Sequence, residues 1–473
     1  MIRFGTGGWR AIIADGFTKA NVQLLTYALC HMMRDENAAQ HGVCIGYDRR
    51  FLSKEASHWA AEVFAAQNIP CRVIDREAPT PLIMFTVKQL ETDYGMAVTA
   101  SHNPAVYNGI KLFTAGGRDA SEAVTKKLEG YIDRFERELI PLMDYDEALQ
   151  RGIVTEINPL NDYIDSILAL VDTEAIKKSR LKIALDPMYG VSQTSLRTIL
   201  LTTRCEVEVI HERHDTLFGG RLPAPNPDTL NSLSAFVVEN KCDLGIATDG
   251  DADRIGVIDD AGEFVHPNKL LVLLYYYLLQ YRGWHGPVVR NNSTTHLLDR
   301  VARAYGEICY EVPVGFKHIS SKMEEMGAII GGESSGGLTV RGHIRGKDGI
   351  YAAALLVEMT AKTGKRLSDL YAEITKKFGE VYTAEADVTL NRVNKQTLMD
   401  RLFVDKQLPV FPFKIERISY LDGCKVYFEN GGFMVARFSG TEPLLRLCCE
   451  MSTQHDADAC LRLFEEFLQA QAA

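Results

Sequence analysis

Three features that this 473-residue chain lacks argue against whole classes of protein. It has no uninterrupted apolar run of about 18 residues, so no membrane span is expected. Its first residues, MIRFGTGGWR, lack the basic region and apolar stretch of a secretory signal, so we expect a cytoplasmic protein. An excess of positive charge is also missing. A formal net charge of -10 argues against broad binding to nucleic acid.

Cysteines at CxxC spacing are absent as well, and most of the ten cysteines lie in apolar, strand-like runs. We therefore expect reduced core residues. Hydrophobic residues make up 46% of the chain and charged residues 24%, which is typical of globular proteins. At roughly 150 residues per domain, the length predicts two to four domains.

A set of three strand-like runs occurs three times along the chain. Amphipathic, helix-like stretches separate the runs, which indicates α/β layers with largely parallel or mixed sheets. The runs are 42–48, 71–75 and 94–100; 181–187, 205–210 and 242–250; and 286–292, 308–314 and 327–334. The third run of each set leads into a polar loop, ASHNP, DGDADR or GGESSGG. Because ligands collect beyond the carboxyl ends of such strands, we expect the three loops to serve one site.

The end of the chain follows a different pattern. Strand-like runs at 381–390, 419–429, 432–439 and 444–451 precede a helix that starts at His455. This order indicates a smaller α+β domain with an antiparallel sheet. The predicted domains are 1–150, 151–260 and 261–378, all α/β, and 379–473, α+β.

The loop from Asp249 to Arg254 carries carboxylates at alternate positions. If the loop is extended, Asp249, Asp251 and Asp253 point to one side. Three carboxylates without His or Cys select a hard cation, Mg²⁺ before Ca²⁺. The alternative is a solvated acidic turn, although close carboxylates after a buried strand repel one another without a cation.

Ser101 follows a strand and precedes the turn formers His102-Asn103-Pro104. This position suits a nucleophile or a phosphoryl carrier. Taken alone, SHNP is equally a turn or a helix start with Ser as its cap. Downstream, NGIK adds a turn and the cation of Lys111, which can approach the same group.

The run RFSGTEP (437–443), followed by Arg446, combines hydroxyls, a glycine and guanidinium groups. Backbone N–H groups at a glycine, short hydroxyl donors and a bidentate Arg together suit a tetrahedral dianion. The alternative is a plain connecting turn. The residues concerned are Arg437, Ser439, Gly440, Thr441 and Arg446.

In GESSGG (332–337), a carboxylate and a hydroxyl, Glu333 and Ser335, lie among glycines and suit sugar hydroxyls. Lys317, His343 and Lys347 add cationic groups beside the loops of the third repeat. Each alone is by default a surface charge, but their position in an acidic protein favours a role in binding substrate.

These loops, in this order and spacing, resemble those of the α-D-phosphohexomutase superfamily, which includes phosphoglucomutases, phosphomannomutases and phosphoglucosamine mutases. The resemblance spans nearly the whole chain. Motifs with counterparts are FGTGGWR (4–10), GYDRR (46–50), TASHNP (99–104), NGIK (108–111), DGDADR (249–254), PVGFK (313–317), GESSGG (332–337), HIRGKDG (343–349) and RFSGTEP (437–443).

The resemblance implies four domains around a central cleft: a phosphoserine domain, a metal-binding domain, a sugar-binding domain and a phosphate-binding C-terminal domain. It implies that Ser101 is a phosphoserine and that a phosphate oxygen on it binds Mg²⁺ together with the three aspartates. Arg10, Lys111 and Arg254 should lie near the same centre. Glu333 and Ser335 are implied to bind sugar hydroxyls, and the groups of the 437–443 loop the distal phosphate.

The implied reaction is that of an isomerase, a phosphoglucomutase. Phospho-Ser101 donates to the free hydroxyl of a hexose monophosphate, and bound glucose 1,6-bisphosphate turns around and returns its other phosphate. Mg²⁺, Arg10 and Lys111 can neutralise charge on the moving group. Lys111 is the first choice of general acid/base, because a Lys surrounded by cations can lose its proton near neutral pH. His102 is the second choice.

Glucose is favoured because Gly337 stands where dual-specificity phosphomannomutases tend to carry His, and because HIRGKDG is similar to phosphoglucomutases. A phosphomannomutase or dual-specificity enzyme is the alternative. A phosphatase or a glucose-1,6-bisphosphate synthase would use the same serine and metal, whereas a non-catalytic sugar-phosphate-binding protein would not need the phosphoryl carrier. The expected partner is a hexose phosphate, with no nucleic acid or membrane, and the chain is expected to be a monomer or homodimer.

Overall fold

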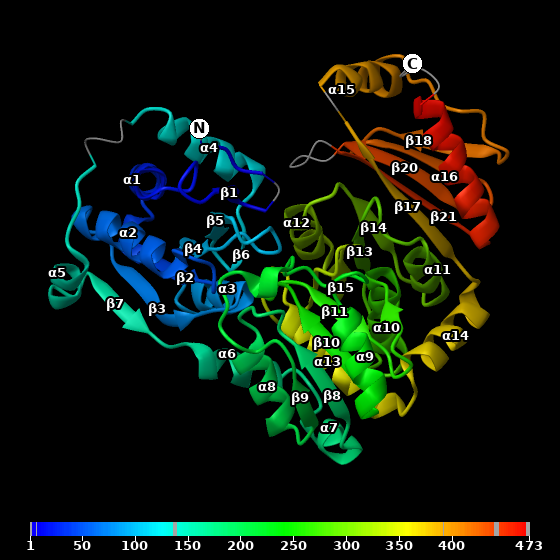
Figure 1. Ribbon diagram of the computed structural model, residues 1–473, viewed down its shortest axis with the longest axis horizontal. Coiled ribbons are helices and arrows are strands. Elements are labelled where there is room, and N and C mark those ends of the chain that lie inside the picture. Colours follow the sequence, from blue (N-terminus) through cyan, green and yellow to red (C-terminus); the bar gives the residue numbers. More distant parts are fainter. Residues whose placement is uncertain (1, 6, 136–139, 391, 439–443, 470–473) are drawn as a thin grey trace. The chain divides into compact units, whose positions relative to one another are not determined.

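The computed structural model describes residues 2–5, 7–135, 140–390, 392–438 and 444–469. They form two compact units, which are described separately (Figure 1). The first unit is Met1–Leu270 with Ser335–Leu367, and the second is Leu271–Ser334 with Ser368–Ala473. These units are larger than single α/β domains, and the four domain boundaries stay predictions.

The first sheet of the first unit has the strand order β1-β5-β4-β2-β3-β7, with β6 beside β5. β4, β2, β3 and β7 run parallel, while β5 runs antiparallel to β4 and β1 antiparallel to β5. All positions of β2 and β4 are buried, as expected for central strands covered on both faces. The strands are β1 (Trp9–Ile12), β2 (Val43–Tyr47), β3 (Cys71–Glu77), β4 (Tyr94–Val98), β5 (Tyr107–Thr114), β6 (Arg118–Asp119) and β7 (Val154–Ile157).

The helices of this layer pack on one another and on the sheet. α1 contacts α2 and α4, and α3 contacts β2, β4 and β5. α1 begins where the Thr18 side chain accepts a hydrogen bond from the backbone N–H of Asn21, which caps the helix. The helices are α1 (Lys19–Asp35), α2 (Ser53–Ala66), α3 (Thr80–Gln89), α4 (Glu122–Ile132) and α5 (Tyr145–Gln150).

The second sheet of this unit has the order β12-β11-β10-β8-β9, with β10, β8 and β9 parallel and β11 and β12 antiparallel. The apolar helix α13 is buried along most of its length and contacts α7, α8 and β11. The strands of this sheet are β8 (Lys182–Asp186), β9 (Glu206–Val209), β10 (Leu244–Thr248), β11 (Ile255–Ile258) and β12 (Phe264–Val265). β16 (Leu338–Val340) lies in the first unit but outside this sheet. The helices are α6 (Leu160–Leu168), α7 (Thr173–Ser179), α8 (Gln193–Thr202), α9 (Asn231–Asn240) and α13 (Gly349–Thr363).

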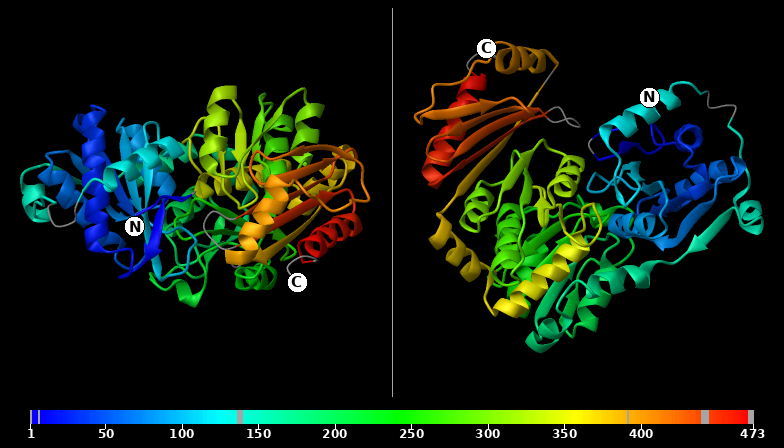
Figure 2. Two further views of the ribbon diagram at one scale, coloured as in Figure 1. Left: turned by 90° about the horizontal axis from the view of Figure 1, so that it is seen from above. Right: turned by 180° about the vertical axis from the view of Figure 1, so that it is seen from behind.

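The second unit combines the parallel strands β14-β13-β15 with an antiparallel sheet of order β17-β21-β20-β19-β18 (Figure 2). The amphipathic helix α16 lays its apolar side on β17 and β21. The strands are β13 (Val288–Asn291), β14 (Cys309–Val312), β15 (Ile330–Gly332), β17 (Tyr382–Thr389), β18 (Ile415–Ser419), β19 (Cys424–Phe428), β20 (Phe433–Phe438) and β21 (Leu444–Met451). The helices are α10 (Pro267–Gln280), which starts at the boundary, α11 (Leu297–Ala304), α12 (Phe316–Met326), α14 (Leu367–Phe378), α15 (Arg392–Met399) and α16 (Gln454–Gln469).

The fold class predicted from the sequence is confirmed: three α/β layers and a smaller C-terminal antiparallel α+β layer. Each of the nine strand-like runs of the repeats coincides with a strand. The C-terminal run 419–429 contains β19, but it also includes the turn between β18 and β19, and β18 was missed. β18 is an edge strand with mostly exposed residues, so it lacks the apolar signal of a core strand.

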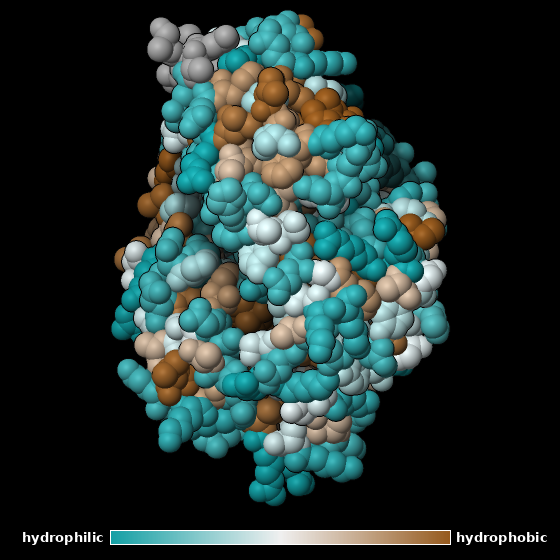
Figure 3. Space-filling model, turned by 90° about the vertical axis from the view of Figure 1, so that its right-hand side faces the viewer, coloured by the Kyte–Doolittle hydropathy of each residue, from teal (hydrophilic) through white to brown (hydrophobic). Residues whose placement is uncertain are grey.

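The cysteines also follow expectation. All ten cysteines are free, and all but Cys309 are buried. Figure 3 shows a mainly hydrophilic face with scattered apolar patches. Within the described parts of the chain, no helix has the length and apolar character needed to cross a membrane.

A buried ionic cluster joins the two sheets of the second unit. Lys425 of β19 is only 1% exposed, and its ammonium donates to Glu311 Oε2 at 2.7 Å and lies 3.0 Å from His296 Nε2. Arg290 of β13 donates to the same Glu311 oxygen at 2.6 Å and also pairs with Asp299. Tyr427 donates its hydroxyl to the other oxygen of Glu311. The C-terminal sheet is therefore held against β13 and β14 by charge-assisted hydrogen bonds.

His296 makes this cluster sensitive to acid. Burial and the positive charges of Arg290 and Lys425 lower the pKa of His296 to about 4, from about 6.5 in an unfolded chain. Between these values the unfolded chain binds more protons, so the free energy of unfolding should fall as the pH drops from about 6.5 towards 4, by at most about 3 kcal/mol. Urea unfolding at a series of pH values measures this loss.

The control is His296→Gln, which can still accept from Lys425 but does not titrate. This variant should lose less stability over that pH range than the wild type, and His455→Gln, at a well-exposed position, should behave like the wild type. Equal acid sensitivity of His296→Gln and wild type would contradict the assignment.

Candidate active site

An aspartate cluster lies at the carboxyl end of β10. The five residues of β10 are all buried. The chain then turns through Asp249, Asp251 and Asp253, which are each at most 1% exposed. One carboxylate oxygen from each lies within 4.8 Å of the others. Within the described ranges this is the one such group of His, Cys, Asp or Glu ligands. The sequence spacing therefore produces one compact cluster.

Ser101 meets this cluster from the carboxyl end of β4. Its hydroxyl donates to Asp249 Oδ2 at 2.8 Å, and its backbone N–H donates to Thr99 Oγ1 at 2.9 Å. Ser101 has a φ of 51°, in the left-handed region where a non-glycine residue is strained. Such strain often marks a functional site, and here it belongs to a tight turn that aims the hydroxyl at the aspartates.

Two lysines reach the same aspartates from different segments. Lys111, in the middle of β5, donates to Asp251 Oδ2 at 2.5 Å and to Asp253 Oδ2 at 2.7 Å. Lys347 lies 2.9 Å from Asp253 Oδ2. The helix α13 that follows its loop contacts β11, and the backbone N–H of Gly349 donates to the carbonyl of Ala252 at 3.1 Å. From its place in HIRGKDG, Lys347 was predicted to bind substrate. In the structure its ammonium pairs with the aspartate cluster.

The other predicted cations lie around Ser101. Arg254 has its Nε 4.0 Å from Asp249 and 3.9 Å from Asp253. Arg10, in β1, donates to Asn103 Oδ1 at 2.5 Å. Burial and the neighbouring Arg254 lower the pKa of Arg10. These cations and the two lysines come from four separate segments of the chain, and the fold brings them to one centre.

The surroundings of Lys111 differ from those that the sequence suggested. Burial alone lowers its pKa, but Asp251 and Asp253 outweigh burial, and the pKa of Lys111 is raised overall. Carboxylates rather than cations are its nearest partners, so the reason given for a neutral Lys111 was wrong. His102 has its Nδ1 3.3 Å from Ser101 Oγ, and burial, Arg254 and Arg10 lower its pKa well below the usual value.

The cluster fits a hard divalent cation. Asp251 Oδ1 and Asp253 Oδ1 are buried and have no hydrogen-bond partner, which is costly for a carboxylate oxygen unless a cation is bound. Burial and the charges of Asp251 and Asp253 raise the pKa of Asp249. Thr80 donates its hydroxyl to Asp251 Oδ2 at 2.6 Å and fixes that carboxylate. An all-oxygen, all-carboxylate donor set suits Mg²⁺.

Arg50 supports the serine loop, a role that its place in GYDRR did not predict. It is 3% exposed, and Asp48 lies 3.4 Å from its Nε. Its Nη atoms donate to four backbone carbonyls of the loop: Ser101 at 2.7 Å, Asn103 at 2.6 Å, Pro104 at 2.9 Å and Tyr107 at 3.0 Å. A buried guanidinium with this many acceptors fixes the turn that carries Ser101.

Arg50→Lys is therefore expected to lower turnover by about 10- to 100-fold, because a single ammonium cannot hydrogen-bond to all the carbonyls that the two Nη atoms of the guanidinium reach. Steady-state assay of the variant measures this. Arg151→Lys, on an exposed i,i+4 pair, is the matched control and should keep full activity. Full activity in Arg50→Lys would show that the loop keeps its conformation without the Arg50 guanidinium.

The predicted sugar and phosphate residues fall into both units. In the second unit, Glu333 Oε1 accepts from Gly315 N at 3.1 Å and Asn291 Nδ2 at 3.4 Å, and Arg437 Nε donates to both oxygens of Asp422. Lys317 is in the first turn of α12, and Arg446 is in β21, 4.0 Å from Asp387. Ser335 and His343 belong to the first unit. Ser439, Gly440 and Thr441 lie outside the described residues.

His343 takes part in a buried network. Its Nε2 lies 2.7 Å from Asp348 Oδ2, and Tyr163 donates to the same oxygen at 2.8 Å. Asp348 also caps α13 through the N–H groups of its first turn. His343 is 7% exposed, so its contacts fix the loop that carries Lys347.

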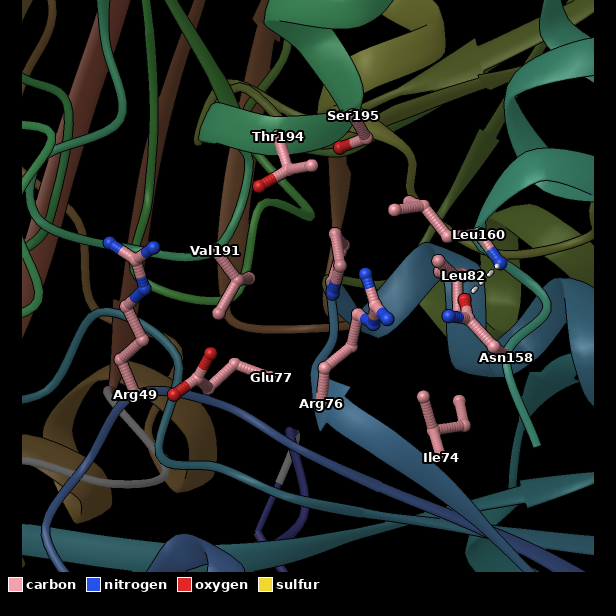
Figure 4. Close-up of a pocket in the computed structure, with 11 residues that line it drawn as sticks. Arg49, Ile74, Arg76, Glu77, Leu82, Asn158, Leu160, Val191, Thr194 and Ser195 are labelled. Atoms are coloured by element: carbon pink, nitrogen blue, oxygen red, sulfur yellow. Dashed lines mark hydrogen bonds between the residues drawn. The ribbon is translucent and has the colours of Figure 1, made fainter. Parts of the chain in front are cut away.

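A small cavity of about 180 Å³ lies elsewhere in the first unit. Figure 4 shows Arg49, Arg76 and Glu77 on one side of it, and Thr194 and Ser195 of α8 on the other. Arg76 is paired with Asp75 at 2.9 Å. None of the predicted site residues lines this cavity, so it does not define the candidate active site.

Comparison with known proteins agrees with the fold and the site. Three models of the phosphoglucomutase/phosphomannomutase α/β/α domains match in chain order: domain I at residues 1–138, domain II at 161–262 and domain III at 266–378. Repeated α/β layers, with a buried serine at a strand end beside an aspartate cluster, are thus those of a sugar-phosphate mutase fold. The chain belongs to the phosphoglucomutase/phosphomannomutase family, in the α-D-phosphohexomutase superfamily, which confirms the resemblance.

Relatives cover nearly the whole chain. A phosphoglucomutase/phosphomannomutase of Thermococcus kodakarensis is 30% identical over 98% of both chains. A phosphoglucosamine/phosphogalactosamine mutase of Sulfurisphaera tokodaii is 29% identical over 83% of this chain and 84% of its own. The crystal structure of a candidate phosphomannomutase from Thermus thermophilus superposes with a TM-score of 0.85, at 28% identity and 99% coverage of both chains.

Proposed function

We propose that the chain is a phosphoglucomutase that interconverts glucose 1-phosphate and glucose 6-phosphate through phospho-Ser101 and bound glucose 1,6-bisphosphate. The observation that carries this proposal is the 2.8 Å hydrogen bond from Ser101 Oγ to Asp249, because it joins the proposed phosphoryl carrier to the aspartate cluster. In the transfer, a P–O bond to the sugar oxygen forms as the P–O bond to Ser101 breaks, and the sugar hydroxyl loses its proton.

The residues around Ser101 then have distinct roles. Asp249, Asp251 and Asp253 would hold Mg²⁺ with an oxygen of phospho-Ser101, and the bound ion would neutralise charge on the transferring phosphoryl group. Arg10, Arg254 and Lys347 add positive charge at the same centre. We retain Lys111 as the first general acid/base and His102 as the second, because both lie within hydrogen-bonding reach of the cluster or of Ser101.

Substrate binding is assigned to the remaining predicted residues. Glu333 and Ser335 would bind hydroxyls near the middle of the sugar, which lets one site accept both orientations of the bisphosphate. Arg437, Arg446 and the 439–441 loop would bind the phosphate that is not reacting, with Lys317 and His343 beside the sugar. Gly337 favours glucose. Relatives named for phosphomannose and phosphoglucosamine make these two sugars the alternatives to test.

A coupled assay tests the proposal. Wild-type protein with Mg²⁺ and trace glucose 1,6-bisphosphate should convert glucose 1-phosphate faster than mannose 1-phosphate or glucosamine 1-phosphate. Mass spectrometry of the peptide that contains Ser101 should find the phosphate there. Release of inorganic phosphate or free bisphosphate as the main product would instead indicate the phosphatase or the synthase. Absence of turnover with all three sugars would overturn the mutase proposal.

A further inference from the structure

Lys425 bridges two sheets of the second unit at the loop that follows β13. Besides Glu311, its ammonium donates to the backbone carbonyl of Asn292 at 2.6 Å, and His296 lies 3.0 Å away. An ammonium has three N–H donors, and three potential acceptors lie within hydrogen-bonding distance of this one. Lys425 thus fixes where the 291–296 loop lies against β19.

Asp422, three residues earlier, makes a second bridge. Its carbonyl accepts from Asn292 Nδ2 at 2.6 Å, and its Oδ2 accepts from the backbone N–H of Val314 at 2.7 Å. The same carboxylate holds Arg437 Nε at 2.9 and 3.0 Å. Asp422 therefore orients a guanidinium of the C-terminal sheet and, at the same time, anchors the start of the 313–317 loop.

Both anchored loops lead to one carboxylate. Glu333 Oε1 accepts from Asn291 Nδ2, in the first loop, and from Gly315 N, in the second. Each donor is next in sequence to a residue held from the C-terminal sheet, Asn292 and Val314 respectively. A shift of the 422–425 segment would therefore move both donors that aim Glu333.

Stability alone does not account for the buried charge. Replacing a buried ion pair by apolar groups of similar volume is often neutral or stabilising, so a buried Lys and Glu pair is weak evidence of a stabilising role. Fixing one geometry among several is a better-attested use of such groups. Besides their side-chain partners, Lys425 and Asp422 each bind a backbone group of a loop, the Asn292 carbonyl and the Val314 N–H, which is what a positioning role requires.

We propose that Asp422 and Lys425 are positioning residues that couple sugar recognition to the C-terminal sheet: they set the 291–296 and 313–317 loops, which aim the Glu333 carboxylate at the sugar hydroxyls. The inference rests on the proposed function, since it takes Glu333 as a sugar ligand. It adds the prediction that a change at Asp422 alters the phosphate-binding and sugar-binding parts of the second unit together, because Asp422 contacts both Arg437 and Val314.

A double-variant cycle tests the coupling. Glucose 6-phosphate binding is measured by calorimetry for wild type, Lys425→Met, Glu333→Gln and the double variant. Lys425→Met is expected to weaken binding by about tenfold, and the double variant should bind no more weakly than Glu333→Gln alone, because contacting networks are not additive. Lys414→Met, whose side chain is 78% exposed on the same sheet, is the matched control and should bind like wild type.

Each outcome separates the inference from the proposed function. Additive losses, or an unchanged affinity in Lys425→Met, would overturn the positioning role while leaving the mutase intact. Failure of the wild type to bind any sugar phosphate would overturn the proposed function and the inference with it. If Lys425→Met does not fold, Asp422→Asn takes its place, with the exposed Asp405→Asn as its control, and the same non-additivity with Glu333→Gln is expected.

Discussion

Replacing Ser101 by alanine should lower mutase turnover by at least about 10⁴-fold, the size of effect seen when a covalent catalytic group is removed. The hydroxyl is the only part of the side chain that can carry the phosphoryl group between the two sugar oxygens. Removing it also deletes the hydrogen bond to Asp249, but one such bond contributes only about 1 kcal/mol to stability. The variant should therefore fold and lack activity.

A second substitution separates chemistry from folding. Ser101 has a left-handed φ of 51°, where glycine is unstrained and alanine is not. Ser101→Gly should thus be as inactive as Ser101→Ala yet more stable than it, by about 1 kcal/mol. The coupled assay and urea unfolding measure the two quantities. Ser166→Ala, which removes a hydrogen bond to Tyr163 in α6, is the control and should stay active.

Retained turnover in both Ser101 variants would mean that another group carries the phosphate. Loss of activity with loss of folding in both would leave no argument for a chemical role. The prediction holds only if activity disappears while the order of stability follows the backbone strain.

The sequence predicted the elements of the site better than their contacts. The strand-to-loop transitions at β4 and β10 could be read directly, because a buried apolar run followed by polar residues has a local signal. Ser101 and the aspartates were therefore found as separate loops. Their meeting, 148 residues apart in sequence, followed only from the rule that ligands gather beyond strand ends.

Residues that act through long-range contacts had no such signal. In the sequence, Arg50 is one of several arginines with nothing to distinguish it. Its role depends on four backbone carbonyls that the fold brings within hydrogen-bonding distance. Lys347 reads as part of a basic loop, and only the packing of the following helix, α13, against β11 places it on Asp253. Lys425 and Glu311 lie 114 residues apart. Spacing along the chain cannot show that a particular cation and carboxylate will be buried together.

The aspartate cluster yields a prediction in which activity and stability move in opposite directions. Three buried carboxylates share the ammonium groups of Lys111 and Lys347. Without a divalent cation the three carboxylates repel one another, and burial with the charges of Asp251 and Asp253 raises the pKa of Asp249. Asp249→Asn removes one charge while keeping the shape. Its amide can accept from Arg254 N, as Asp249 Oδ1 does, and donate to Ser101 Oγ.

Asp249→Asn is therefore expected to raise the free energy of unfolding of the metal-free protein, by about 1–2 kcal/mol, and to lower turnover by about 10³-fold. Urea unfolding in the presence of a chelator and the coupled assay measure these effects. Asp165→Asn, at an exposed position of α6, is the control and should change neither.

Mg²⁺ provides the decisive comparison. A ligand that binds only the folded state raises its stability by mass action, so Mg²⁺ should raise the unfolding midpoint of the wild type and of Asp165→Asn in a concentration-dependent way. Asp249→Asn should respond weakly or not at all, because it lacks one of three anionic ligands. If its midpoint rises with Mg²⁺ as the wild type's does, the ion binds elsewhere. If the metal-free variant is less stable than wild type, hydrogen bonding rather than repulsion dominates the cluster, because Lys111, Lys347 and Arg254 already neutralise the three carboxylates.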